Sequence, residues 1–143
     1  MELKMNIAEL QAFLDDAFPQ VAGDFEFVSI APKEVVMALS ASEKHLRPGG
    51  TVSGPSMFAL ADVSAYFAIL SMIGPVGLAV TTNCAIDFMR KPGPGRLLCR
   101  MQLLKLGRVL AVCEGRLFSE GTEDVPVARA SLTYSIPPSD KST

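Results

Sequence analysis

Apolar residues fill most positions between 56 and 73, and Asp62 is the one charged residue among them. A helix that is apolar on nearly every side is buried rather than half-exposed. Its start is well marked, because Pro55 suits the first helical turn and either Ser53 or Gly54 can cap it. A Gly-Pro pair at 74–75 ends it. The pattern therefore predicts a buried central helix running from Gly54 to about residue 73.

The remaining pattern predicts one surface helix and six strands. Residues 7–18 place apolar side chains at helical spacing with acids between them, and Pro19 closes the segment. Two short segments rich in Val, Ile and Phe flank Ala31-Pro32-Lys33, which indicates a hairpin. Beyond residue 78 the period is two, as in strands with one core face. The predicted strands span 25–30, 34–40, 78–88, 96–106, 109–119 and 127–136.

The strand at 78–88 is predicted to have one core face and one polar face. If the side chains alternate strictly, the core face carries Leu78, Val80, Thr82, Cys84, Ile86 and Phe88. The same alternation puts on the second face Thr81, Asn83, Ala85 and Asp87. We expect Asp87 to be solvated or paired with Arg90.

One long buried helix and a series of strands joined by turns predict an α+β fold, in which an antiparallel sheet wraps around the helix. The 143 residues suit a single domain, and no internal repeat or linker interrupts them. We expect this domain to span residues 1–143, with an N-terminal helix at about 5–18, a core at about 24–136 and a disordered tail at 137–143.

The amino-acid composition limits the classes of partner that this chain is expected to bind. Hydrophobic residues make up 49% of the chain, which is high for a small monomer and indicates self-association as a dimer or tetramer. The net charge is −2 and no run of Lys and Arg exceeds two residues, so we expect no nucleic-acid partner. We also expect no membrane span, because Asp62 and Ser64 interrupt a run barely as long as the roughly 20 residues a bilayer needs.

The three cysteines, Cys84, Cys99 and Cys113, are odd in number and lie in apolar, strand-like segments. This favours buried, reduced thiols in a reducing compartment. The N-terminus carries acids rather than the basic start and apolar run of a signal peptide. We therefore expect a cytoplasmic protein.

Asp62 is the main candidate for chemistry. A carboxylate in such a helix loses hydration worth several kcal/mol unless it is paired or hydrogen-bonded, so a function is one explanation for its presence. The alternative is that Asp62 faces a polar seam and bonds a neighbouring backbone group or hydroxyl. The chain has no GxSxG, P-loop, GxGxxG or CxxC motif, and its sole histidine, His45, is expected on a loop surface. We expect neither a metal site nor a cofactor.

The helix N-terminus at Ser53, Gly54 and Pro55 offers unpaired N–H groups and a partial positive charge, which suit the oxygen of a polarised carbonyl or thioester. Asp62 lies two turns further on, roughly 12 Å away at 1.5 Å per residue. These groups cannot meet within one subunit. A dimer that pairs the helices could bring Asp62 of one chain to Gly54 of the other.

Residues 45–55, HLRPGGTVSGP, resemble the PaaI-like acyl-CoA thioesterases of the hotdog fold. The pattern of that family reads His-x-Asn-x-x-Gly-x-x-His-Gly-Gly. A helical Asp follows, eight residues after the first glycine of the closing Gly-Gly pair. Asp62 falls at the position of that acid. The resemblance continues through residues 81–92, TTNCAIDFMRKP, and covers roughly residues 24–136.

The resemblance implies a role for each matching residue. Asp62 would be the nucleophile or general base, the Gly54 N–H the donor to the thioester oxygen, and Thr81 a hydroxyl near the attacking water. Two positions depart from the family: Arg47 stands where it has Asn, and Ser53 where it has the His that helps to hold the thioester. The Ser53 hydroxyl could hydrogen-bond as the imidazole does, and Arg47 could bind an anion.

The expected function is hydrolysis of an acyl- or aroyl-CoA thioester, with CoA entering only as part of the substrate. The residues expected to bind this substrate are Arg47, Asn83, Arg90, Lys91 and Arg108. The alternative is a hotdog protein that binds an acyl or aromatic ligand without turnover, which the changes at Arg47 and Ser53 favour. A dehydratase is a more distant alternative, because the related enzymes use a catalytic His and His45 is not at its position.

Overall fold

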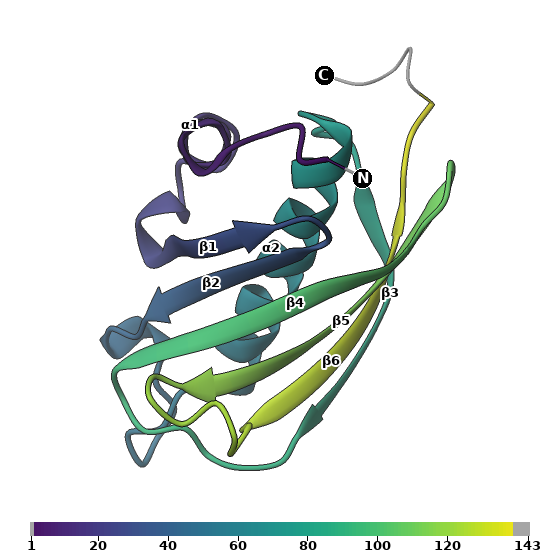
Figure 1. Ribbon diagram of the computed structural model, residues 1–143. Coiled ribbons are helices and arrows are strands. Elements are labelled where there is room, and N and C mark those ends of the chain that lie inside the picture. Colours follow the sequence, from purple (N-terminus) through teal and green to yellow (C-terminus); the bar gives the residue numbers. More distant parts are fainter. Residues whose placement is uncertain (1, 139–143) are drawn as a thin grey trace.

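A six-stranded antiparallel sheet curls around helix α2 (Gly54–Ile73) in the computed structural model, which describes residues 2–138 (Figure 1). The strand order is β1-β2-β4-β5-β6-β3, so β1 and β3 form the two edges. The predicted α+β fold, one long helix wrapped by an antiparallel sheet, is confirmed. The other elements are α1 (Ile7–Ala17), η1 (Ala22–Asp24), β1 (Phe25–Ala31), β2 (Glu34–Ser40), η2 (Glu43–His45), β3 (Val80–Phe88), β4 (Arg96–Leu106), β5 (Leu110–Ser119) and β6 (Ala128–Ser135).

Helix α2 begins and ends where its sequence predicts. The Ser53 side chain caps it by accepting the Ser56 N–H at 3.3 Å, and Gly74 ends it at a φ of 97°, a conformation that suits glycine. Within the described residues, α2 is also long and apolar enough to cross a membrane by length and composition alone. However, 67% of that apolar window is buried inside the protein, as expected of a core helix.

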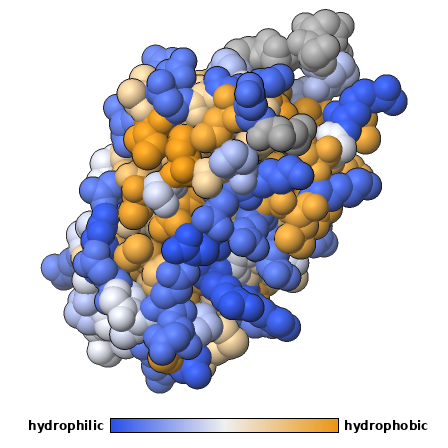
Figure 2. Space-filling model, in the orientation of Figure 1, coloured by the Kyte–Doolittle hydropathy of each residue, from blue (hydrophilic) through white to orange (hydrophobic). Residues whose placement is uncertain are grey.

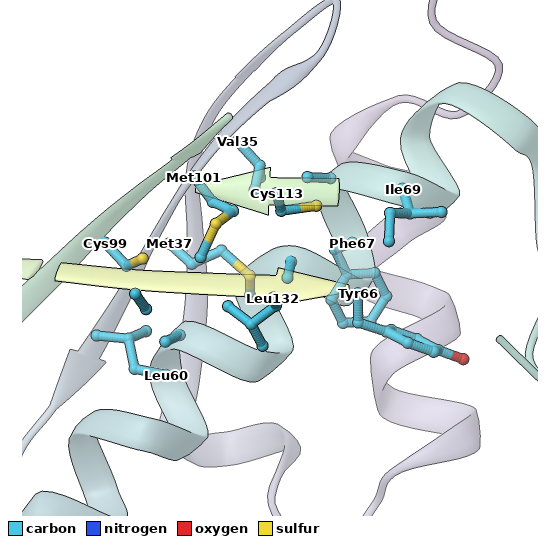
Figure 3. Packing of buried hydrophobic residues seen from close by; sticks show 14 of the residues in the cluster. Val35, Met37, Leu60, Tyr66, Phe67, Ile69, Cys99, Met101, Cys113 and Leu132 are labelled. Atoms are coloured by element: carbon cyan, nitrogen blue, oxygen red, sulfur yellow. The ribbon is translucent and has the colours of Figure 1, made fainter. Parts of the chain in front are cut away.

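The core lies between α2 and the concave face of the sheet, where side chains from β2, β4, β5 and β6 meet the helix (Figure 3). Two of the three thiols, those of Cys99 and Cys113, are fully buried there, and all three cysteines are free. Burial raises the pKa of both thiols to about 12, so they stay protonated at neutral pH. The predicted burial of Cys99 and Cys113 is confirmed, whereas Cys84 is half-buried.

Strand β3 corrects the predicted alternation. Thr81 pairs with Tyr134 of β6, but the next pair in the ladder is Asn83 with Thr133, so Thr82 is an extra residue in a β-bulge. The bulge reverses the side-chain faces before it. Thr81 therefore shares the helix-facing side with Cys84, and Val80, predicted to be in the core, is 54% exposed.

The convex face of the sheet is polar, and hydrophilic side chains cover much of it in Figure 2. Arg100 of β4 forms ion pairs with Glu34 at 3.0 Å and with Glu123 at 2.5 Å. Asp87 pairs at 2.8 Å with Arg129, its direct neighbour across the β3–β6 ladder. The Asp87 side chain is exposed, so the predicted solvation is confirmed, whereas its ion-pair partner is Arg129 and not Arg90, because the ladder puts Arg129 opposite the aspartate. Of the predicted tail, residues 139–143 lie outside the described part of the chain.

Candidate functional site

One stripe of α2 faces a cavity instead of the sheet. Along this stripe lie Pro55, Phe58, Ala59, Asp62 and Val63, spaced three and four residues apart, so these residues share one side of the helix. The cavity measures about 410 Å³, and its other walls come from the end of α1 and the residues that follow it, and from β1, β2, η2 and β6. Asp62 thus lies half-buried in a wall that is mostly apolar.

Two hydroxyl groups donate hydrogen bonds to the same oxygen of Asp62. The Thr81 hydroxyl lies 2.6 Å from Oδ1 and the Tyr134 hydroxyl 2.7 Å from Oδ1. The Tyr134 oxygen is also 3.0 Å from the main-chain oxygen of Asp62. No residue among 2–138 donates to Oδ2. The carboxylate is therefore held from the sheet side through one oxygen, as the structural interpretation of Asp62 expects, while its second oxygen has no protein donor among these residues.

The bulge in β3 explains how Thr81 reaches Asp62. In an unbroken ladder Thr81 would share the face of Asn83, which is exposed on the convex side of the sheet. The extra residue turns Thr81 toward the helix. Burial and the charge of Asp62 also raise the pKa of the Cys84 thiol, which lies on the same side of the strand.

Tyr134 is a residue of this site for which no role was predicted from the sequence. Its ring is 2% exposed and its hydroxyl is buried against Asp62. Burial, followed by the nearby Asp62 charge, raises the pKa of Tyr134 far above its usual value, so the hydroxyl keeps its proton and acts as a donor. A signal was present in the sequence: a tyrosine on the core face of β6 needs a partner for its hydroxyl.

The N-terminus of α2 retains a single free backbone donor among its first residues. Pro55 has no N–H, the Ser56 N–H is capped by Ser53, and the Met57 N–H bonds the Ser53 carbonyl at 3.0 Å. This leaves the Gly54 N–H without an acceptor among residues 2–138. The Phe88 ring lies against Gly54, and a Cβ at position 54 would come within 3.4 Å of it.

Gly54 lines a second cavity of about 400 Å³, together with three predicted substrate-binding cations, Arg47, Arg90 and Lys91. Arg90 and Lys91 lie here because β3 ends at Phe88, and only one residue separates Phe88 from Arg90 in the chain. Arg90 also donates to the Pro126 carbonyl at 2.5 Å. The structure therefore brings these three cations together with Gly54.

Two predicted substrate-binding residues lie elsewhere in the chain. Asn83 is exposed on the convex face of β3. Arg108 lies in the β4–β5 turn, at the end of the sheet where Leu110, Ser135 and Val80 lie side by side, opposite the Phe88 end. Neither residue lines the cavity of Asp62 or that of Gly54.

His45 is buried, so its predicted place on the loop surface was wrong. The reason is a set of local bonds: its Nδ1 accepts the Ser42 N–H at 2.9 Å, and its carbonyl accepts the Ser53 N–H at 2.8 Å. Its Nε2 lies 3.5 Å from Asp24, and both side chains line the cavity of Asp62. Among residues 2–138, no group of three His, Cys, Asp or Glu side chains is arranged to hold a metal ion.

The sequence model of the thioesterase superfamily matches residues 49–126, more than half of the chain, from the loop before α2 to the end of the loop after β5. The chain belongs to the thioesterase superfamily. The match includes Gly54, Asp62 and Thr81, and the fold is that of the hotdog thioesterases. The resemblance to the PaaI-like members is confirmed, and thioester hydrolysis is the general chemistry of this thioesterase.

Three relatives illustrate the relationship. A Pseudomonas aeruginosa protein assigned as an esterase is 30% identical, over 93% of this thioesterase and 99% of the relative. A solved structure from Silicibacter sp. TM1040, assigned as a thioesterase, is 56% identical with a TM-score of 0.89 and covers 96% of each chain. The phenylacetic acid degradation protein PaaI of Thermus thermophilus is 30% identical with a TM-score of 0.72, over 83% of this chain and 99% of that one.

The geometry of the helix cap leads to a prediction about Ser53. Its hydroxyl accepts the Ser56 N–H and donates to the Ser56 hydroxyl at 3.0 Å, so it is already occupied by the cap. We expect Ser53→Ala to lower the free energy of unfolding by about 1 kcal/mol and kcat for thioester hydrolysis only a few-fold. Ser53→Asn, which preserves the cap, is the control and should keep both values in thermal unfolding and thiol-release assays. A collapse of activity in both variants would mean that Ser53 has taken over the role of the histidine found in the family.

Proposed function

We propose that this thioesterase hydrolyses acyl- or aroyl-CoA thioesters with Asp62 as nucleophile or general base. The observation that supports this most directly is the arrangement of the carboxylate. Two hydroxyls hold Oδ1 at 2.6 and 2.7 Å, while Asp62 lines an apolar cavity large enough for an acyl group. A carboxylate in an apolar wall is poorly solvated, which favours its reaction with an electrophilic carbon or with water.

Hydrolysis of the thioester can follow either of two routes, and the atoms and protons balance in both. As a nucleophile, Asp62 attacks the thioester carbon, the C–S bond breaks, and the CoA thiolate leaves and takes a proton; water then hydrolyses the anhydride. As a general base, Asp62 takes a proton from water while the hydroxide attacks the same carbon, and the thiolate leaves with that proton. In both routes the developing oxyanion needs a donor, and the free N–H of Gly54 at a helix N-terminus suits this role.

The donor and the acid must come from two copies of the chain, because Gly54 and Asp62 lie roughly 12 Å apart along α2 and line different cavities. The edge strand β3 supports self-association, since its outer edge has no partner strand among the described residues and it carries two exposed apolar residues, Val80 at 54% and Phe88 at 51%. Phe58 on the accessible stripe of α2 is 38% exposed. We infer a homodimer, or a dimer of dimers, with the site shared between subunits.

Self-association can be measured directly. We expect sedimentation velocity at micromolar concentration to give a dimer or tetramer, because the exposed apolar residues of β3 and α2 need a partner surface. Phe88→Lys and Val80→Lys together should shift the protein toward monomer and abolish activity. Val109→Lys is the control, since Val109 is 60% exposed but lies in the β4–β5 turn. A wild-type monomer that retains full activity would contradict the shared site.

The cavity beside Gly54 suits the phosphates of CoA, because Arg47, Arg90 and Lys91 are among the residues that line it. An antiparallel, two-fold pairing of β3 edges would also carry Arg108 of the second copy toward the Phe88 end of the first. This would explain how a cation remote from Gly54 within one chain could contribute to binding.

Replacing Arg90 and Lys91 together by Ala should raise KM for CoA esters by roughly five-fold while kcat changes little, because exposed charge pairs contribute modestly to binding. The matched control removes the same charge elsewhere, with Lys105→Ala and Arg116→Ala on β4 and β5. Steady-state kinetics at low ionic strength would make the difference largest. An equal change of KM in both double variants would contradict the assignment of CoA binding to this cavity.

The decisive experiment is a thiol-release assay with acetyl-, hexanoyl-, decanoyl-, benzoyl- and phenylacetyl-CoA. We expect wild-type protein to release CoA from at least one ester and Asp62→Asn to lower kcat by about 10² or more, with the oligomer and melting temperature preserved. Asp16→Asn on the exposed side of α1 is the control. A purely structural Asp62 would instead cost about 1–3 kcal/mol of stability and leave the activity of each folded molecule intact.

The second candidate function is ligand binding without turnover. It is favoured by Arg47 and by Ser53, whose hydroxyl is engaged in the cap of α2. Wild-type protein that binds an acyl-CoA or the free acid tightly, yet releases no thiol from any of the five esters, would replace the enzyme proposal with this one.

A further inference from the structure

Tyr134 links the closing strand to the reactive helix. It lies on β6 directly opposite Thr81 of β3, and its ring is almost completely buried. The ring packs in an aromatic cluster with Tyr66, whose centroid is 6.2 Å away. A tyrosine packed in this way has a fixed ring, so its hydroxyl has a fixed position relative to α2.

The hydroxyl of Tyr134 contacts Asp62 at two points. Its oxygen is 2.7 Å from the carboxylate Oδ1 and 3.0 Å from the main-chain oxygen of the same residue. A phenol has one proton to donate, and the charged carboxylate is the stronger acceptor. These contacts to the side chain and main chain of one residue restrict rotation of the Asp62 side chain relative to its own helix.

Thr81 completes the restraint from a second strand. Its hydroxyl donates to the same Oδ1 at 2.6 Å, so the two donors occupy one oxygen of the carboxylate and leave the other without a donor among residues 2–138. The two oxygens of Asp62 are therefore not equivalent. Oδ1 is engaged by the sheet, whereas Oδ2 is available to react.

We infer that Tyr134 is a positioning residue for Asp62: together with Thr81 it holds Oδ1 so that Oδ2 is the oxygen presented to the thioester carbon or to the attacking water. This inference rests on the proposed hydrolysis and names the residue that orients its acid. Because the hydroxyl of Tyr134 keeps its proton at neutral pH, the restraint persists across the neutral range.

The role of Tyr134 differs from that of an ordinary buried hydroxyl, and the chain contains a matched comparison. Tyr66 is 7% exposed and belongs to the same aromatic cluster, but its hydroxyl donates to the Gly77 carbonyl at 2.9 Å and does not contact Asp62. Figure 3 shows the Tyr66 hydroxyl pointing away from the neighbouring core side chains. Removing each hydroxyl therefore separates the loss of a buried hydrogen bond from the loss of control over Asp62.

The test compares Tyr134→Phe with Tyr66→Phe in the five-ester thiol-release assay, using the ester that wild-type protein hydrolyses fastest. We expect Tyr134→Phe to lower kcat about 30-fold with KM within about two-fold of wild type, because a misplaced carboxylate affects the reaction rather than ground-state binding. Tyr66→Phe should keep kcat within about three-fold. Thr81→Val should resemble Tyr134→Phe, and Thr81→Ser, which restores a hydroxyl, should recover most of the lost rate.

A double-variant cycle identifies the route of the effect. If Tyr134 acts through Asp62, Tyr134→Phe should cause no further loss of kcat in an Asp62→Asn background. An equal loss in both backgrounds, or wild-type kcat in Tyr134→Phe, would overturn the positioning role while leaving the hydrolase proposal in place. If Tyr134→Phe does not fold, the Thr81→Val and Thr81→Ser pair tests the control of Oδ1 in its place. Wild-type protein inactive on all five esters would overturn both the hydrolase proposal and this role.

Discussion

The requirement to hydrogen-bond one carboxylate inside an apolar helix organises the rest of this structure. Asp62 can occupy the middle of α2 only because two hydroxyls reach it from the sheet, at 2.6 and 2.7 Å. These hydroxyls come from β3 and β6, which must therefore be neighbours with Thr81 opposite Tyr134. The strand order, the bulge at Thr82 and the burial of β6 together place both hydroxyls within hydrogen-bonding distance of Asp62.

The proposed acid, Asp62, and the proposed donor, the Gly54 N–H, depend on different kinds of contact. The acid depends on long-range contacts between elements distant in the sequence, whereas the donor depends on three consecutive residues. Ser53 caps one N–H, Pro55 lacks another, and Gly54 is left with a free one. Local backbone chemistry thus creates the donor, and tertiary packing creates the orientation of the acid. Self-association is the step that would combine them.

The same distinction explains what could be predicted from the sequence. The helix around Asp62, its cap at Ser53, strand β4 at Arg96–Leu106 and the grouping of Arg90 with Lys91 follow from local pattern, and the structure agrees with each. The roles proposed for these residues in catalysis and CoA binding stay predictions.

The face of Thr81 could not be predicted, because one bulged residue inverts the alternation on which the prediction depended. Tyr134 was missed because its significance lies in a contact 72 residues away along the chain, and His45 was misplaced because bonds to the main-chain N–H groups of Ser42 and Ser53 bury it.

A further consequence concerns β3, which contacts both the proposed acid and the proposed donor. Thr81 near its start bonds Asp62, and Phe88 at its end packs on Gly54. Inserting or deleting a single residue between Thr81 and Phe88 would shift one of these two contacts relative to the other, whereas the same change in the β5–β6 loop would leave both contacts in place.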